Sequence, residues 1–176
     1  RTKLSENLFK GLAPWMSRLP GGLIHVNVVG CALFAAISGS SAATVATVGK
    51  MSIPELRKRN YPEKLLLGSL AGSGTLGLLI PPSIILIIYG VTVQVSIAKL
   101  FIAGIIPGIM IAIFFMFYVI GWSMVNKNIM PKMDETFSFS QKIKQSGQLI
   151  PVIVLIVAVI GSIYVGIATA TEAASL

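Results

Sequence analysis

The sequence predicts an all-α polytopic membrane protein, and three observations support this prediction. Hydrophobic residues make up 55% of the 176 residues and charged residues only 11%, whereas an ordinary globular domain carries about 25% charged residues. The charged residues divide the chain into four uncharged runs, each longer than the roughly 20 residues that one helical crossing needs. Two of these runs are interrupted at their centres. This composition excludes a disordered chain, a coiled coil and a soluble nucleic-acid domain.

The first half of the chain predicts a re-entrant hairpin between two polar segments. Residues 1–18 are polar, and we expect a cytoplasmic or interfacial lead segment there. The uncharged run 19–49 has two apolar arms and a polar cluster at its centre, made of Ser38, Gly39, Ser40 and Ser41. A polar tip between apolar arms is typical of a hairpin that enters and leaves the membrane on one face. Residues 50–64 would follow as a basic cytoplasmic loop.

The second run, 65–98, predicts a broken transmembrane helix. As one unbroken helix it would be about 51 Å long, well beyond a hydrocarbon core of about 30 Å. Its centre contains three glycines and then two adjacent prolines, namely Gly72, Gly74, Gly77, Pro81 and Pro82. Proline lacks an amide donor and disfavours helix in the residue before it. We therefore expect two half-helices joined by an extended stretch.

The remaining segments predict two ordinary transmembrane helices and a connector. The runs 100–126 and 145–171 each fit one spanning helix with some tilt. Residues 127–144 are polar and would form a cytoplasmic connector that holds an interfacial helix. Residues 172–176 would begin the next segment of a longer, truncated chain.

The positive charges indicate which side of the membrane each segment occupies. The net charge is +8, and lysine and arginine favour cytoplasmic loops. If 19–49 is a hairpin and the next two runs each cross once, every basic residue except Lys99 lies on the cytoplasmic side. A full crossing by 19–49 would place the basic residues of 1–18 outside. The charge distribution therefore favours the hairpin, and the excess positive charge fixes orientation.

The interruptions also indicate a function. Non-helical backbone at membrane depth persists only where protein buries it or where it lines a wet cavity. Hairpin tips and broken helices that meet near the midplane are typical of secondary transporters. Unwound carbonyls there can coordinate Na⁺, and helix amino ends can face an anionic solute. Because no Asp or Glu lies within the four runs, carbonyls and hydroxyls would have to coordinate any cation.

Other features are interpreted as structural. Gly68 with Gly72, and Gly104 with Gly108, have the GxxxG spacing of packed membrane helices. His25 is expected to be a hydrogen-bonded structural residue rather than a proton or ligand site.

Several motifs, in the right order, resemble the large membrane subunit of TRAP (tripartite ATP-independent periplasmic) transporters. They are Leu19-Pro20-Gly21-Gly22-Leu23, Ser38-Gly39-Ser40-Ser41-Ala42, Gly74-Thr75-Leu76-Gly77, Ile80-Pro81-Pro82-Ser83, Leu100-Phe101, Ala103-Gly104 and Pro107-Gly108. The resemblance covers nearly the whole chain. It implies a fragment that runs from the first-repeat hairpin to the start of the second repeat.

This resemblance implies half of an inverted-repeat, elevator-type transporter in the bacterial inner membrane. The family imports organic acid anions, of dicarboxylate or sialic-acid type, by symport with Na⁺. A periplasmic solute-binding protein delivers the solute, and a small membrane subunit pairs with the large one. The resemblance implies no cofactor other than the coupling ion Na⁺ and no nucleic-acid partner.

The resemblance also assigns site residues, none of them catalytic. The first-repeat Na⁺ site would comprise Ser38, Gly39, Ser40, Ser41, Gly72, Gly74, Thr75 and Gly77. The solute would lie beside Ser41, Pro81, Pro82 and Ser83. No metal other than Na⁺ is implied.

Two alternatives to a transporter remain open from the sequence. A channel or scaffold subunit could share the hairpin. An intramembrane serine protease could use Ser41 as its nucleophile, but such a serine needs a general base within hydrogen-bond reach. The only histidine, His25, would lie about 24 Å away along a helical arm, so the protease is disfavoured.

Overall fold

The computed structural model describes residues 4–131 and 139–164, and every regular element in these ranges is helical. In chain order they are α1 (Leu4–Met16), α2 (Ile24–Ser38), α3 (Ser41–Lys58), α4 (Glu63–Gly74), η1 (Thr75–Leu78), α5 (Ile84–Val93), α6 (Ile97–Val125), η2 (Lys127–Ile129), α7 (Phe139–Ser146), η3 (Gly147–Leu149) and α8 (Ile150–Tyr164). The expected all-α fold is confirmed for these residues. The expected segment 172–176 lies outside them.

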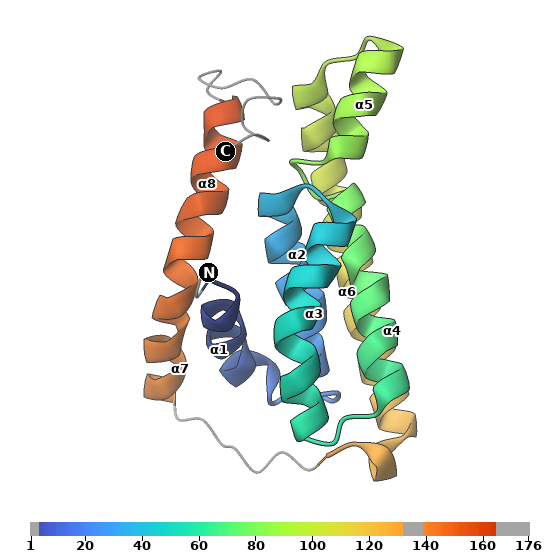
Figure 1. Cartoon of the computed structure of the whole chain (residues 1–176), viewed down its shortest axis with the longest axis vertical. Coiled ribbons are helices and arrows are strands. Elements are labelled where there is room, and N and C mark those ends of the chain that lie inside the picture. The colour runs from blue at the N-terminus through green and yellow to red at the C-terminus, as the bar shows by residue number, and fades with distance from the viewer. Residues whose placement is uncertain (1–3, 132–138, 165–176) are drawn as a thin grey trace.

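The lead segment contains a packed helix that the sequence interpretation missed. Leu8, Phe9 and Leu12 of α1 are buried in the main core. Their spacing places them on one face of a helix, although the segment as a whole is polar. At its end, the indole Nε1 of Trp15 donates to the hydroxyl of Ser146 on α7 at 2.8 Å. In Figure 1, α1 lies between the α7–α8 arm and α2.

Helices α2 and α3 are antiparallel neighbours joined by residues 39–40 (Figure 1). Gly39 ends α2 in the left-handed conformation, with φ of 59°, which glycine adopts without a steric penalty. Ser40 begins α3 as its N-cap, and its hydroxyl accepts a hydrogen bond from the amide of Ala43 at 3.4 Å. The sequence Gly-Ser thus ends one helix and starts the next within two residues.

The boundaries expected around this pair need correction. α3 does not end with the apolar run at Gly49 but continues to Lys58, so the expected loop 50–64 shrinks to residues 59–62. The continuation is amphipathic, since Lys50 is exposed whereas Ser52 and Leu56 are buried. Charged residues on one face do not end a helix whose other face is packed.

The run 65–98 holds two helices with an interruption between them. α4 ends at Gly74, η1 covers the next turn, residues 79–83 are non-helical, and α5 begins at Ile84. Figure 1 shows α4 and α5 following one another in the same general direction. The chain then turns back at Gln94, whose φ is 54°. α6 begins at Ile97, before the expected boundary at residue 100, so Lys99 lies in its first turn.

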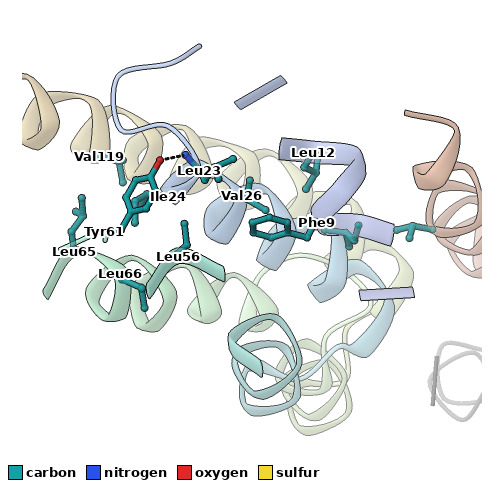
Figure 2. Packing of buried hydrophobic residues seen from close by; sticks show 12 residues of the cluster. Phe9, Leu12, Leu23, Ile24, Val26, Leu56, Tyr61, Leu65, Leu66 and Val119 are labelled. Atoms are coloured by element: carbon teal, nitrogen blue, oxygen red, sulfur yellow. Dashed lines mark hydrogen bonds between the residues drawn. The ribbon is translucent and has the colours of Figure 1, made fainter. Parts of the chain in front are cut away.

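The main core surrounds α2 (Figure 2). Leu23, Ile24 and Val26 pack there with side chains from α1, α3, α4 and α6. The hydroxyl of Tyr61, in the short loop before α4, accepts a hydrogen bond from the amide of Leu23 at 3.0 Å. Farther along α2, the amide nitrogen of Asn27 donates to the Ser69 hydroxyl on α4 at 3.0 Å. Polar bonds therefore supplement apolar packing between α2 and its neighbours.

Two helical stretches are long and apolar enough to cross a membrane: Ile97–Val125 and Gln141–Ile163. Only 17% and 11% of their most apolar windows are buried within the protein, whereas the core helix of a soluble protein would be mostly buried. The second stretch starts within α7, so the apolar helix begins inside the expected connector 127–144, for which an interfacial helix was expected. The expected run 145–171 is described as far as residue 164.

Candidate functional site

The turn between α2 and α3 lies directly against the interruption between α4 and α5. The amide of Ile84, the first residue of α5, donates to the carbonyl of Gly39 at 3.2 Å. The hydroxyl of Ser41 donates to the carbonyl of Gly74, the last residue of α4, at 2.8 Å. These bonds unite the two interruptions of the apolar runs in one site. We call it the turn–break site and define it as residues 38–41 with residues 72–83.

Glycine allows the two backbones to approach this closely. A Cβ at Gly39 would lie 2.6 Å from the carbonyl oxygen of Pro82. A Cβ at Gly77 would lie 2.8 Å from the amide nitrogen of Ser41. Both obstacles are backbone atoms and cannot rotate away as a side chain could. Because glycine has no side-chain oxygen, any coordination of Na⁺ by these residues would come from their backbone carbonyls.

The hydroxyls predicted for the site all have hydrogen-bond partners within it or in the first turn of α3 beside it. Ser38 pairs with Thr44 at 2.9 Å between their oxygens, and Thr75 donates to the carbonyl of Gly72 at 2.7 Å. Ser83, which is fully buried, donates to the carbonyl of Leu78 at 2.8 Å. A hydroxyl that donates one hydrogen bond keeps lone pairs that can still accept or coordinate. The site is thus closely cross-linked and still has oxygen ligands available.

Thr44 is a site residue that the sequence interpretation did not assign. It is fully buried and bonds Ser38 across the turn. Once α3 is known to begin at Ser41, Thr44 falls within its first turn, on the side facing the end of α2. Placing the start of α3 at Ser41 would have identified Thr44 as a site residue.

The non-helical stretch leaves several carbonyls without a partner. Within the described ranges, no hydrogen bond is accepted by the carbonyls of residues 79–82. Pro81 and Pro82 are buried. A buried carbonyl without a partner costs free energy, and a bound cation or an ordered water would offset that cost.

Helix ends of both polarities meet at the turn–break site. The carboxyl ends of α2 and α4 are there, and so are the amino ends of α3, capped by Ser40, and α5, which follows Ser83. Helix carboxyl ends carry partial negative charge and amino ends partial positive charge. The site therefore has partial negative charge and partial positive charge within a few residues of each other.

The α6 helix covers the interruption from one side. A Cβ at Gly104 would lie 2.7 Å from the carbonyl oxygen of Leu79, and one at Gly108 would lie 2.9 Å from Cγ1 of Ile80. The expected packing role of this GxxxG pair is therefore confirmed. Of the other pair, Gly72 lies against Phe115, whereas no atom lies within 4 Å of a Cβ at Gly68.

Ser41 and His25 do not form a catalytic serine–histidine pair. Ser41 lies at the turn and bonds Gly74, whereas His25 lies at the opposite end of α2. The Nε2 of His25 is 2.8 Å from the carbonyl oxygen of Pro20, with which it makes a hydrogen bond. His25 thus has the structural role expected of it, and Ser41 has no histidine base.

A largely apolar helical chain with two membrane-length helices and interrupted backbone buried between its helices has the features of an integral membrane protein. The sequence matches the family described as "Tripartite ATP-independent periplasmic transporter, DctM component" over residues 1–176. The chain belongs to this family. The resemblance inferred from its motifs is thereby confirmed, and the family is one of transporters rather than enzymes, as expected.

Curated relatives agree with this assignment. The C4-dicarboxylate TRAP transporter large permease protein DctM of Pseudomonas aeruginosa is 37% identical over 161 residues, which are 92% of this chain and 37% of the relative. The sialic acid TRAP transporter permease protein SiaT of Haemophilus influenzae is 35% identical over 173 residues, covering 97% of this chain and 27% of the relative. The ectoine/5-hydroxyectoine TRAP transporter large permease protein UehC of Ruegeria pomeroyi is 33% identical over 175 residues, which are 99% of this chain and 40% of the relative. The chain thus spans about a third of the length of these relatives.

Proposed function

We propose that this chain is the first-repeat half of a permease subunit that imports organic acid anions by symport with Na⁺. The observation that carries the proposal is the contact between the α2–α3 turn and the α4–α5 interruption, where Ser41 bonds Gly74 and Ile84 bonds Gly39. Two interruptions that meet inside a membrane protein are typical of the binding sites of secondary transporters.

The Na⁺ would bind to oxygens of the turn–break site. Na⁺ is a hard cation and prefers oxygen ligands, and carbonyls together with hydroxyls suffice where no carboxylate is present. The carbonyls near the carboxyl ends of α2 and α4 lie on the negative side of the helix dipoles. The candidate ligands are oxygens of Ser38, Gly39, Ser40, Ser41, Gly72, Gly74, Thr75 and Gly77.

The solute anion would lie near the amino ends of α3 and α5. Partial positive charge there favours a carboxylate. Ser41 is half-buried beside this region. Pro81, Pro82 and Ser83 are buried, so they would shape the anion site mainly through the path of the backbone. The second repeat would supply the other side.

The α2–α3 pair would be a re-entrant hairpin, and the transporter would work as an elevator. In Figure 1 the turn of this pair lies part of the way along the neighbouring helices, well short of the far end of α5. This supports a hairpin that does not cross the bilayer. The proposed partners are a small membrane subunit and a periplasmic solute-binding protein, with the complex in the bacterial inner membrane.

The test is solute uptake by the full-length transporter in proteoliposomes, with its small subunit and binding protein present. We expect uptake to require an inward Na⁺ gradient and the binding protein, and to saturate with solute. Uptake that is indifferent to Na⁺ would contradict the proposal, and flux that does not saturate would indicate a channel.

Variants link the test to this site. Ser40→Leu removes the N-cap hydroxyl of α3 and places an apolar side chain at the turn, so uptake should fall at least about tenfold. Thr92→Val is the control, because the Thr92 hydroxyl is exposed and bonds only Ile88 of its own helix. Uptake by this control should stay within about twofold of the unmodified transporter.

A further inference from the structure

A cavity of about 440 Å³ lies at the opposite end of α2 from the turn–break site. Its walls are the turn before α2, Tyr61 in the loop before α4, and the end of α6 with the residues that follow. This is also the end of the molecule where α3 meets α4 (Figure 1). The sequence around that connection is basic, with Arg57, Lys58, Arg59 and Lys64. We propose that this cavity binds the phosphate headgroup of an anionic phospholipid.

The charges of the cavity favour a phosphate. Arg18 and Lys127 both line it, and none of its lining residues within the described ranges is acidic. The ion pairs among the described residues are Arg57–Glu63 and Arg59–Glu55, so neither Arg18 nor Lys127 has a carboxylate partner in those ranges. Two cations that have no carboxylate partner among the described residues, beside one cavity, complement a single anionic group.

The helix ends around the cavity are compatible with an anion. The turn that contains Gly21 and Gly22, with φ of 99° and 54°, leads into the amino end of α2, which carries partial positive charge. The carboxyl end of α6 has the opposite polarity. There, however, the Trp122 carbonyl already accepts hydrogen bonds from both the backbone amide and the side-chain nitrogen of Asn126, each at 3.0 Å.

A hydrogen-bond donor is also available inside the cavity. Ser123 lines it, is only 5% exposed, and its hydroxyl makes no hydrogen bond within the described residues. A hydroxyl at the wall of a cavity can donate a hydrogen bond to a ligand or to water there. A phosphate oxygen held by Arg18 and Lys127 would accept it.

The apolar wall of the cavity favours a lipid over free phosphate. Met124 lines the cavity and is 55% exposed. Phe117, Gly121 and Met124 have the spacing of one helix face, and all three are exposed. An acyl chain could lie along this face of α6 while the headgroup occupies the cavity, whereas inorganic phosphate would use only the charged part. The charge distribution along the chain places this end at the cytoplasmic leaflet, where anionic lipids attract basic segments.

Native mass spectrometry of the full-length transporter, titrated separately with phosphatidylglycerol and phosphatidylcholine, tests the proposal. The unmodified transporter should retain phosphatidylglycerol in preference to phosphatidylcholine. The double variant Arg18→Gln/Lys127→Gln should weaken phosphatidylglycerol binding at least about tenfold, since each basic contact near a membrane surface is worth about 1 kcal/mol. The charge-preserving variant Arg18→Lys/Lys127→Arg should retain most of the binding.

The control is Lys50→Gln/Lys64→Gln, which removes two exposed charges that do not line the cavity. This variant should bind phosphatidylglycerol as the unmodified transporter does, and millimolar inorganic phosphate should not displace the lipid. Three results would each overturn the proposal: equal retention of the two lipids, unchanged binding by the Arg18→Gln/Lys127→Gln variant, or displacement by inorganic phosphate alone. Lipid retention does not depend on Na⁺ coupling, so its outcome is independent of the proposed transport function.

Discussion

Gly39 lies against the carbonyl of Pro82 so closely that a Cβ on Gly39 would be 2.6 Å from the Pro82 oxygen. Gly39 also has φ of 59°, in the left-handed region. Two independent constraints therefore exclude a side chain at the same position. One is the left-handed conformation of Gly39 itself, and the other is its contact with Pro82 in the interruption between α4 and α5.

Gly39→Ala should strongly impair both stability and transport. The left-handed conformation costs a non-glycine residue about 1–2 kcal/mol, and the backbone contact with Pro82 adds an overpacking cost of about 1–3 kcal/mol. Thermal unfolding of the full-length transporter in detergent measures the first effect, and proteoliposome uptake the second. Gly68→Ala is the matched control, because nothing lies within 4 Å of its Cβ. Equal behaviour of the two variants would contradict the packing described for Gly39.

Ser41→Ala should remove one tie between the turn and α4. The Ser41 hydroxyl bonds the Gly74 carbonyl at 2.8 Å, and a typical hydrogen bond contributes about 0.5–1.5 kcal/mol. We expect a loss of that size in the free energy of unfolding. If the turn–break site holds Na⁺, the Na⁺ concentration for half-maximal uptake should also rise several-fold. A loss of stability with an unchanged Na⁺ concentration for half-maximal uptake would support the hydrogen bond between Ser41 and Gly74 but contradict an ion site at Ser41.

The glycines of α6 should differ in their tolerance of alanine. Gly104→Ala should be the most destabilising, by about 1–3 kcal/mol, because its Cβ would meet the backbone oxygen of Leu79. Gly108→Ala should cost less, since its Cβ meets the side chain of Ile80, which can shift. Gly121→Ala should be neutral or slightly stabilising, because its Cβ meets nothing within 4 Å. Unfolding measurements on the three variants would reveal a different order if α6 packed otherwise.

Tyr61→Phe should destabilise the protein by about 1–3 kcal/mol, because the buried amide of Leu23 would lose its acceptor. Tyr89→Phe provides the comparison, since Tyr89 is 52% exposed. The loss should appear in the free energy of unfolding. Equal stability of the Tyr61→Phe and Tyr89→Phe variants would contradict this prediction. It would show that water replaces the Tyr61 hydroxyl as the acceptor for the Leu23 amide.

The effect of Tyr61 should depend on pH. Burial raises the pKa of the Tyr61 hydroxyl, an effect that outweighs the lowering by the Leu23 backbone bond and by the charge of Arg59. The unfolded chain would ionise this group near pH 10. The stability that the neutral phenol contributes is thus fully present below about pH 10 and is lost as the pH rises through the higher folded pKa. The stability difference between the unmodified protein and Tyr61→Phe should shrink above pH 10, and a constant difference would contradict this.

The interruptions of the chain could be predicted because their causes are local. Adjacent prolines at 81 and 82 remove two successive amide donors and so strongly disfavour a continued helix. The Gly39-Ser40 pair suits a helix end followed by a helix start. The helix break and the turn between α2 and α3 both fall at these residues.

Other features could not be predicted because they depend on contacts between distant segments. The extension of α3 to Lys58 follows from burial of Leu56 against the core, which the charges of 50–64 conceal. The sequence contains no sign that Ser41 would bond the carbonyl of Gly74 in particular. The amphipathic face of α1 is present in the sequence, but the charged residues spread through 1–18 conceal it.

The polar bonds of α2 have a mechanical consequence. Near its start the amide of Leu23 bonds Tyr61, farther along Asn27 bonds Ser69, and at its end the carbonyl of Gly39 bonds the amide of Ile84. Sliding α2 along α4 and α5 would stretch all three attachments at once, which favours displacement of these helices together as one block. For the proposed transporter, we therefore expect opening and closing at the outer boundary of this block, with little change of the distances inside the turn–break site.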